Sequence, residues 1–231
     1  MSLPDDLKFD PASFSGVVRL FPLPNLVLFP HVLQPLHIFE PRYREMLEDA
    51  LAGDHLIAMA VLAPGWESDY EGRPPVHPVA CLGRVATHVA LDDGRYNVLV
   101  AGLARVALGE ELAPTTSFRR APATVCVERY PAKYLSERES LQRRLFTSFR
   151  SALPGTAEAQ APLSQLLGHE VDLGVLTDIV AYTLDLDTVR KAELLAQLDV
   201  RKRAKWLLEH LAERGHSSSE DVGFPPDFSA N

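Results

Sequence analysis

The sequence predicts an α+β protein, with a β-rich N-terminal part followed by a helical C-terminal part. Three observations support this fold class. Residues 17–129 contain short apolar or alternating stretches separated by Gly, Pro and Asp, a pattern typical of strands. From about residue 135 onward, apolar residues recur with the period of a helix. The 18 prolines among 231 residues favour many turns over one long helical bundle.

Six stretches are expected to form strands, at residues 17–21, 34–39, 56–62, 81–91, 96–108 and 123–129. Asp93-Gly94 stands between two apolar runs, which indicates a hairpin turn that requires positive φ. Polar and apolar residues roughly alternate in 96–100, as in a strand with one buried face. The segments 64–79 and 110–122 remain as long loops, which are often functional or disordered.

One helix is expected to interrupt the strands. Pro41 suits its first turn, where the missing N–H has no partner to lose, and Gly53 is a natural C-terminal stop. Between these two residues, apolar side chains fall at helical spacing: Tyr43, Met46, Leu47, Ala50 and Leu51.

The C-terminal part is expected to form helices at 136–152, 159–168, 172–184, 188–197 and 200–213. Ser136 and Glu139 have the spacing of a capping box, and Asp187 and Asp199 are expected to cap the last two helices. The chain is therefore divided into a flexible leader at 1–15, a β-rich part at 16–130, a helical part at 131–214 and a disordered polar tail at 215–231.

Composition excludes several classes of protein. A net charge of −8 argues against a general nucleic-acid binder, which needs clustered Lys and Arg. Cys81 and Cys126 make neither a disulfide framework nor a zinc site. No signal peptide is evident, and the longest apolar run, at 56–63, is too short to span a bilayer. We therefore expect a cytoplasmic protein without membrane contact.

Motifs that carry chemistry are missing from the sequence. It has no Gly-Lys dipeptide for a P-loop, no G-x-G-x-x-G and no G-x-S-x-G. His169-Glu170 begins like a zinc-protease motif, but the second histidine is absent. His37 and His88 lie in expected strands, where a hydrogen-bonded packing role is the usual one. We therefore expect no catalytic residue, no metal and no cofactor.

Two groups of residues are candidates for binding a protein or peptide. Trp66 and Tyr70 lie in the long loop, where aromatic side chains serve as partner anchors or fold back onto the protein. Arg143 and Arg144 form a basic helix face, which either contacts an acidic partner or balances Glu137 and Glu139.

Residues 21–30 (FPLPNLVLFP) and 36–44 (LHIFEPRYR) together resemble the opening of the N-terminal domain family of Lon proteases. Later blocks agree with this resemblance, namely 83–86, 93–96 and 102–106, and the segment around Asp178, Lys191 and Asp199. The resemblance covers about residues 17–213. One departure is His31, which stands where glycine is common in the family.

The resemblance implies a PUA-like pseudo-barrel with a helical bundle, in a module that captures unfolded or tagged protein substrates. The ATPase and Ser–Lys protease parts of full Lon proteases have no counterpart in the sequence, so we expect a non-catalytic binding module. An RNA-binding PUA-like protein and a small hydrolase remain alternatives. Within the motif we expect structural roles, with Phe29 and Phe39 in the core and a Glu40–Arg42 ion pair. The other motif residues with an expected structural role are Pro22, Pro30, Pro41, Tyr43, Gly94 and Gly102.

Overall fold

The computed structural model describes residues 9–70, 72–153 and 171–215. These residues form two compact units. One contains 9–70, 72–127 and 185–196, and the other contains 128–153, 171–184 and 197–215. The sequence pattern places 131–214 together as one helical part, whereas the structure groups 185–196 with the strands. The expected helix at 159–168 lies outside the described residues.

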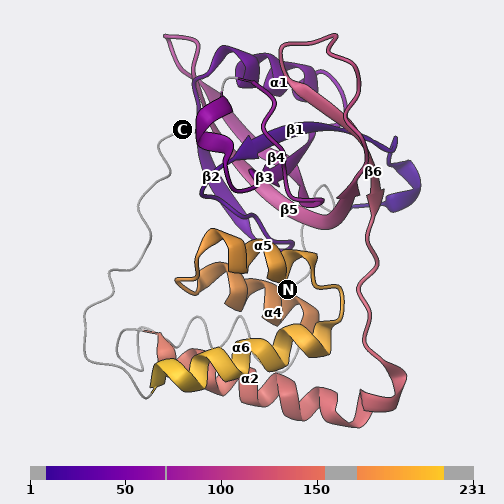
Figure 1. Cartoon of the computed structure of the whole chain (residues 1–231), viewed down its shortest axis with the longest axis vertical. Coiled ribbons are helices and arrows are strands. Elements are labelled where there is room, and N and C mark those ends of the chain that lie inside the picture. The colour runs from indigo at the N-terminus through magenta and orange to yellow at the C-terminus, as the bar shows by residue number, and fades with distance from the viewer. Residues whose placement is uncertain (1–8, 71, 154–170, 216–231) are drawn as a thin grey trace. The chain divides into compact units, whose positions relative to one another are not determined.

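The first unit is built on a six-stranded mixed sheet (Figure 1). Its strands are β1 (Val17–Leu23), β2 (Leu33–Ile38), β3 (Leu56–Val61), β4 (Val79–Ala90), β5 (Tyr96–Leu108) and β6 (Arg119–Val125). The order is β2-β5-β4-β3-β1-β6, with β1 and β3 parallel and the other pairs antiparallel. Because β6 also pairs with β5, the sheet closes on itself, as a pseudo-barrel requires. The fold class predicted from the sequence is therefore confirmed.

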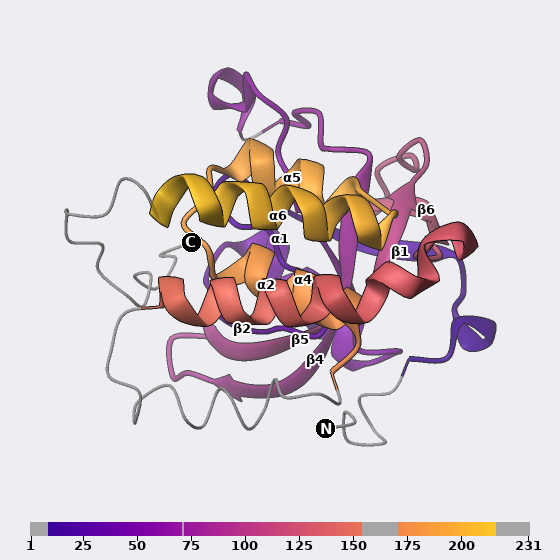
Figure 2. The same cartoon turned by 90° about the horizontal axis from the view of Figure 1, so that it is seen from below.

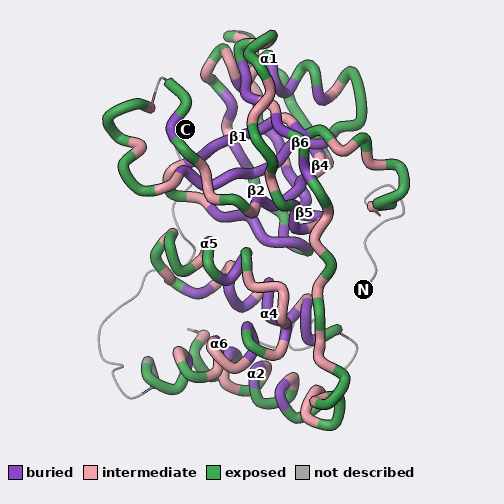
Figure 3. The backbone as a smooth tube through the Cα atoms, turned by 45° about the vertical axis from the view of Figure 1, so that its right-hand side comes forward, coloured by how far each residue is buried: buried purple, intermediate pink, exposed green. Residues whose placement is uncertain are grey.

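The interior of the barrel is apolar. Residues from five strands meet there, among them Leu20, Ala58, Leu82, Val106 and Ala121. Figure 3 shows buried residues in purple along the strands and exposed residues in green along the connecting loops. The helix α1 (Pro41–Leu51) packs on β1 and β3. Of the side chains expected from its spacing, Tyr43, Met46, Leu47 and Ala50 are buried and Leu51 is half-buried. The ring centroids of Tyr43 and Phe21 lie 4.6 Å apart.

Two glycines of the barrel occupy positions that disfavour a side chain, one by its φ and the other by its close contact with neighbouring backbone. Gly94 has a φ of +79° in the β4–β5 hairpin, as the Asp-Gly pair predicts. At Gly102, a Cβ would lie 2.1 Å from the carbonyl oxygen of Phe29, because the 29–32 turn lies directly against β5. His31 donates its backbone N–H to the Gly102 carbonyl at 2.9 Å, and Gly102 donates to Val32 at 2.8 Å.

His31 adopts the conformation that glycine favours. Its φ is +67°, so the turn keeps left-handed backbone although the residue carries a Cβ. The turn at this position therefore carries local backbone strain that a glycine would not.

The helix α5 (Thr188–Ala196) packs against β4. Buried Arg105 on β5 donates a 2.8 Å hydrogen bond to the carbonyl of Leu195, at the end of this helix. The expected cap is present, because Asp187 accepts the Arg190 N–H at 2.7 Å. A long-range contact between β5 and α5 thus explains why this helix groups with the strands.

The second unit contains the short 3-10 helix η4 (Ala132–Glu137) and the helices α2 (Arg138–Ala152), α4 (Leu173–Thr183) and α6 (Val200–Gly215). Helices α2 and α6 run side by side (Figure 2). Fully buried Arg203 on α6 contacts Thr177 and Asp178 on α4 and reaches Glu128 at 2.5 Å. Asp199 caps α6 as expected, accepting the Lys202 N–H at 3.1 Å.

Three expectations about local structure are wrong. Phe39 is 42% exposed, because it follows buried Ile38 and so points to the opposite face of the sheet. Ser136 lies inside η4, and α2 begins at Arg138 without a side-chain cap, so the capping box does not form. The last strand spans Arg119–Val125 and not 123–129. It begins with two arginines, of which Arg119 is buried and paired with Glu111.

Candidate functional site

The long loop after β3 is tied to the motif that precedes α1. Trp66 and Tyr70 are both half-buried and their rings meet edge to face, with centroids 5.6 Å apart. The Tyr70 hydroxyl donates to Glu40 at 2.8 Å, and Arg42 donates to the Tyr70 carbonyl at 3.4 Å. Tyr70 therefore folds back onto the motif, and Trp66 keeps part of its ring accessible.

Glu40 and Arg42 form the expected ion pair, at 2.9 Å. The guanidinium of Arg42 also lies over the rings of Tyr43 and Tyr70, 4.8 and 5.0 Å from their centroids. Burial, followed by the hydrogen bond to the Glu40 carboxylate, raises the pKa of the Tyr70 hydroxyl, so that it stays protonated as a donor. These polar groups are occupied with one another, which indicates a structural role.

A second surface consists of apolar side chains on the outer face of β2, β5 and β4. Residues paired directly across an antiparallel sheet point to the same face. Pro35 is paired with Leu99, and Leu99 with Thr87. Leu33 is 49% exposed and Val89 60% exposed, and exposed Phe39 continues the row of β2. We call the set Leu33, Pro35, Phe39, Val89 and Leu99 the apolar sheet face.

His37 lies in the middle of this face as a packing residue. Its Nδ1 is 2.8 Å from the Asn97 amide oxygen, its Nε2 is 3.2 Å from Arg95, and its ring stacks on Phe39 with centroids 6.2 Å apart. The expectation of a hydrogen-bonded packing histidine is confirmed for His37, whereas His88 is exposed on β4. The polar atoms of His37, with exposed Thr87 and Asn97, interrupt the apolar side chains of this face.

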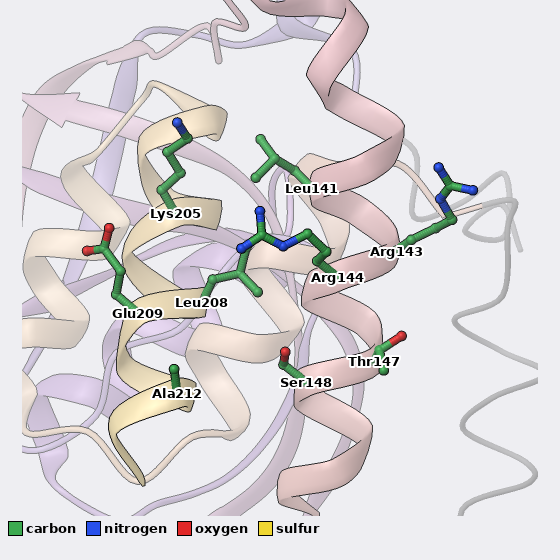
Figure 4. A pocket seen from close by; sticks show the side chains of 9 residues that line it. All are labelled: Leu141, Arg143, Arg144, Thr147, Ser148, Lys205, Leu208, Glu209 and Ala212. Carbon is green, nitrogen blue, oxygen red and sulfur yellow. The ribbon is translucent and has the colours of Figure 1, made fainter. Parts of the chain in front are cut away.

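The third surface is a groove between α2 and α6, with a volume of about 630 Å³. Its lining includes Arg143 and Arg144 from α2 and Lys205 from α6, a combination that the sequence could not show. We call it the α2–α6 groove, and it is lined by Leu141, Arg143, Arg144, Thr147, Ser148, Lys205, Leu208, Glu209 and Ala212. Figure 4 shows Arg144 extending from α2 toward α6, whereas Arg143 points away from α6.

Glu137 does not balance Arg143 and Arg144, contrary to one of the two interpretations of the sequence. Its carboxylate pairs with Arg201 at 3.0 Å and lies 3.8 Å from Lys205. The hydrogen bond from Arg201 lowers the pKa of the Glu137 carboxyl below its usual value, although burial acts in the opposite direction. Within the described residues, neither Arg143 nor Arg144 lies within ion-pair distance of a carboxylate.

The described part of the chain offers little for covalent or metal chemistry. It contains no group of three or more His, Cys, Asp or Glu side chains placed to hold a metal ion. Cys81 is buried, and burial raises the pKa of the Cys126 thiol, which disfavours the reactive thiolate. Among the helices of 9–70, 72–153 and 171–215, none is long and apolar enough to cross a membrane.

The fold defines a class of protein that combines a closed mixed sheet with a helical unit. Residues 17–213 match the profile described as the ATP-dependent protease La (LON) substrate-binding domain. The chain belongs to this family, and the family suggested by residues 21–44 is confirmed.

Relatives and solved structures agree with this assignment. Over 196 residues, the chain is 27% identical to the Lon protease of Rhizobium meliloti, and over 189 residues it is 27% identical to that of Xanthomonas oryzae. These matches cover 85% and 82% of the chain but only 24% and 22% of the relatives, so the chain spans about a quarter of their length.

Two solved structures share the fold. The N-terminal domain of the Lon protease of the Mycobacterium avium complex gives a TM-score of 0.68 at 16% identity, and covers 85% of this chain and 98% of that one. A Lon N-terminal domain protein from Xanthomonas campestris gives 0.58 at 17% identity, with 84% and 97% covered.

Proposed function

We propose that the chain is a recognition module that binds unfolded or tagged protein segments and does not itself cleave them. The observation that carries the proposal is the apolar sheet face, found in a member of a family described by substrate binding. The match covers only the substrate-binding part of the family, so the ATPase and protease activities of Lon proteases are not part of the proposal for this chain.

Unfolded proteins differ from folded ones chiefly by their exposed apolar side chains, and the apolar sheet face offers a matching surface. Leu33, Phe39 and Val89 are between 42% and 60% exposed, so each has about 1 kcal/mol of apolar burial still to gain. After the loss of translational and rotational freedom on association, this area supports binding in about the micromolar to millimolar range. Such weak binding suits a module that must release what it captures.

The aromatic loop is proposed as a secondary contact. Trp66 keeps part of its ring accessible, whereas Tyr70 is held by Glu40. Trp66 is therefore the better candidate of the two for an anchor. The net charge of −8 and the small number of cations on these surfaces favour a protein ligand over RNA.

The test is binding of the full chain to a permanently unfolded protein, such as a fluorescein-labelled, reduced and carbamidomethylated protein chosen for a net charge near zero, followed by fluorescence anisotropy. Leu33→Ser with Val89→Ser should weaken binding about tenfold, because the double variant removes two exposed side chains of the face. The matched control is Leu135→Ser with Val189→Ser, which removes two side chains of similar exposure elsewhere and should change binding less than about twofold. Equal losses in both double variants would refute the site.

A further inference from the structure

The α2–α6 groove differs in character from the apolar sheet face. Its residues on α2 run from Leu141 to Ser148, which is about two helical turns or about 10 Å along the helix axis. Buried Leu141 and half-buried Leu208 supply an apolar floor, and Ser148 adds a hydroxyl. The groove thus has room for one or two side chains of a partner and for the backbone that carries them.

The rim of the groove is positively charged, although the whole chain carries −8. Arg143, Arg144 and Lys205 line it, against the carboxylate of Glu209 and that of Glu137, which lies 3.8 Å from Lys205. Other arginines of the same unit are paired: Arg138 with Asp172 and Arg201 with Glu137. Arg143 and Arg144 lack such a pair among the described residues, and Figure 4 shows Arg144 reaching into the space between the helices.

We infer that the α2–α6 groove binds an acidic segment of a partner protein, in which two or more carboxylates flank an apolar side chain. Guanidinium groups bind carboxylates through two parallel hydrogen bonds, which gives Arg144 a defined role at the centre of the groove. The apolar side chain would lie against Leu141 and Leu208, and Lys205 would attract the second carboxylate. The inference does not depend on the apolar sheet face.

A nucleic acid fits the groove less well. Phosphate backbones require a longer track of cations, and single strands also use aromatic platforms for their bases. The lining of the groove contains three cations, one carboxylate and no aromatic side chain. A protein segment with a few carboxylates matches this lining better.

The experiment measures fluorescence anisotropy of labelled peptides of about twelve residues with the full chain, long enough to span the groove in extended form. One peptide has acidic pairs on both sides of a leucine, a second has lysines in their place, and a third has serines. We expect the acidic peptide to bind about tenfold more tightly than the serine peptide, and the lysine peptide to bind least. Raising NaCl from about 50 to about 500 mM should weaken the acidic peptide's binding severalfold.

Arg144→Glu should weaken binding of the acidic peptide about tenfold or more, while Arg144→Lys should retain part of it. The matched control is Arg150→Glu, an identical charge change at an exposed position of α2 outside the groove, and it should change binding less than about twofold. Equal losses in Arg144→Glu and Arg150→Glu would reduce the effect to general charge attraction and overturn the inference.

Other occupants give distinct results, each of which overturns the inference. Self-association of the chain that Arg144→Glu abolishes would assign the groove to a second copy. Tighter peptide binding by a Glu220→Lys, Asp221→Lys variant would assign it to the chain's own C-terminal residues. Preference for an oligouridine over the acidic peptide would assign it to RNA.

The two proposals fail separately. Arg144→Glu should leave binding of the unfolded protein unchanged, and the Leu33→Ser, Val89→Ser variant should leave binding of the acidic peptide unchanged. Circular dichroism and thermal denaturation of each variant confirm that it is folded. Loss of acidic-peptide binding in the sheet-face variant alone would place the acidic site elsewhere and overturn the inference.

Discussion

Gly102→Ala should strongly destabilise the barrel, because the added Cβ meets backbone that has no freedom to move aside. The Cβ would lie 2.1 Å from the carbonyl oxygen of Phe29, 2.9 Å from its carbonyl carbon and 3.2 Å from the Cα of Pro30. Restoring ordinary contact requires the turn to shift by about 1 Å, in a closely packed interior. That shift would strain the two backbone hydrogen bonds that join Gly102 to His31 and Val32.

The expected loss follows from these contacts. Overpacking of this kind costs about 1–3 kcal/mol, and each weakened backbone hydrogen bond adds about 1 kcal/mol. A total loss of about 3–5 kcal/mol is a large fraction of the free energy of unfolding of a typical domain, which is about 5–15 kcal/mol. Urea denaturation followed by circular dichroism measures the change. Gly109→Ala is the control, since its Cβ would come no closer than 3.5 Å to Pro122. A loss below about 1 kcal/mol in Gly102→Ala would refute the reasoning.

Three further predictions test other parts of the molecule by the same denaturation assay. His31→Gly should stabilise the chain by about 0.5–1 kcal/mol, because it removes a Cβ from left-handed backbone; a destabilised variant would contradict this. Arg203→Met should destabilise the helical unit by about 3–5 kcal/mol, because buried Asp178 loses this counter-ion, and adding Asp178→Leu should recover part of the loss. Burial raises the pKa of the Tyr43 hydroxyl above its usual value, so its contribution is complete below about pH 10 and is lost as the pH rises further. Tyr43→Phe should therefore flatten the alkaline decline in stability, and an unchanged decline would assign it to other groups.

Local signals in the sequence predicted much of the fold because their causes are local. Asp187 and Asp199 cap the helices expected, since a cap needs only the next few residues of the chain. The capping box at Ser136 did not form, because Ser136 lies inside η4, and Glu137, which precedes α2, pairs with Arg201, 64 residues away. The start of β6 was not predicted, because it begins with charged Arg119. From the sequence alone, an arginine is expected in an exposed loop, whereas Arg119 is buried through its ion pair with Glu111.

The binding surfaces were harder to predict than the fold. The apolar sheet face joins residues of three strands, so only register shows that Pro35, Leu99 and Thr87 lie in one row. One signal was nevertheless present. Buried Ile38 and a period of two predict that Phe39 points outward, so both residues could not belong to the core. The α2–α6 groove depends on the packing of helices from separate parts of the chain, and only Arg143 and Arg144 were recognised from the sequence.

The positions along α6 separate the stability of the helical unit from the character of its groove. Arg203, Ala204, Leu207 and Leu211 are buried and hold α6 in place. Lys205, Leu208, Glu209 and Ala212 fall between them at helical spacing and line the groove. Because the two sets share no residue, the groove can change its charge without removing a contact of the core. Substitutions at Lys205 or Glu209 should therefore change stability by less than about 0.5 kcal/mol. If binding of the acidic peptide changes while the denaturation midpoint does not, the groove recognises its ligand independently of the fold that supports it.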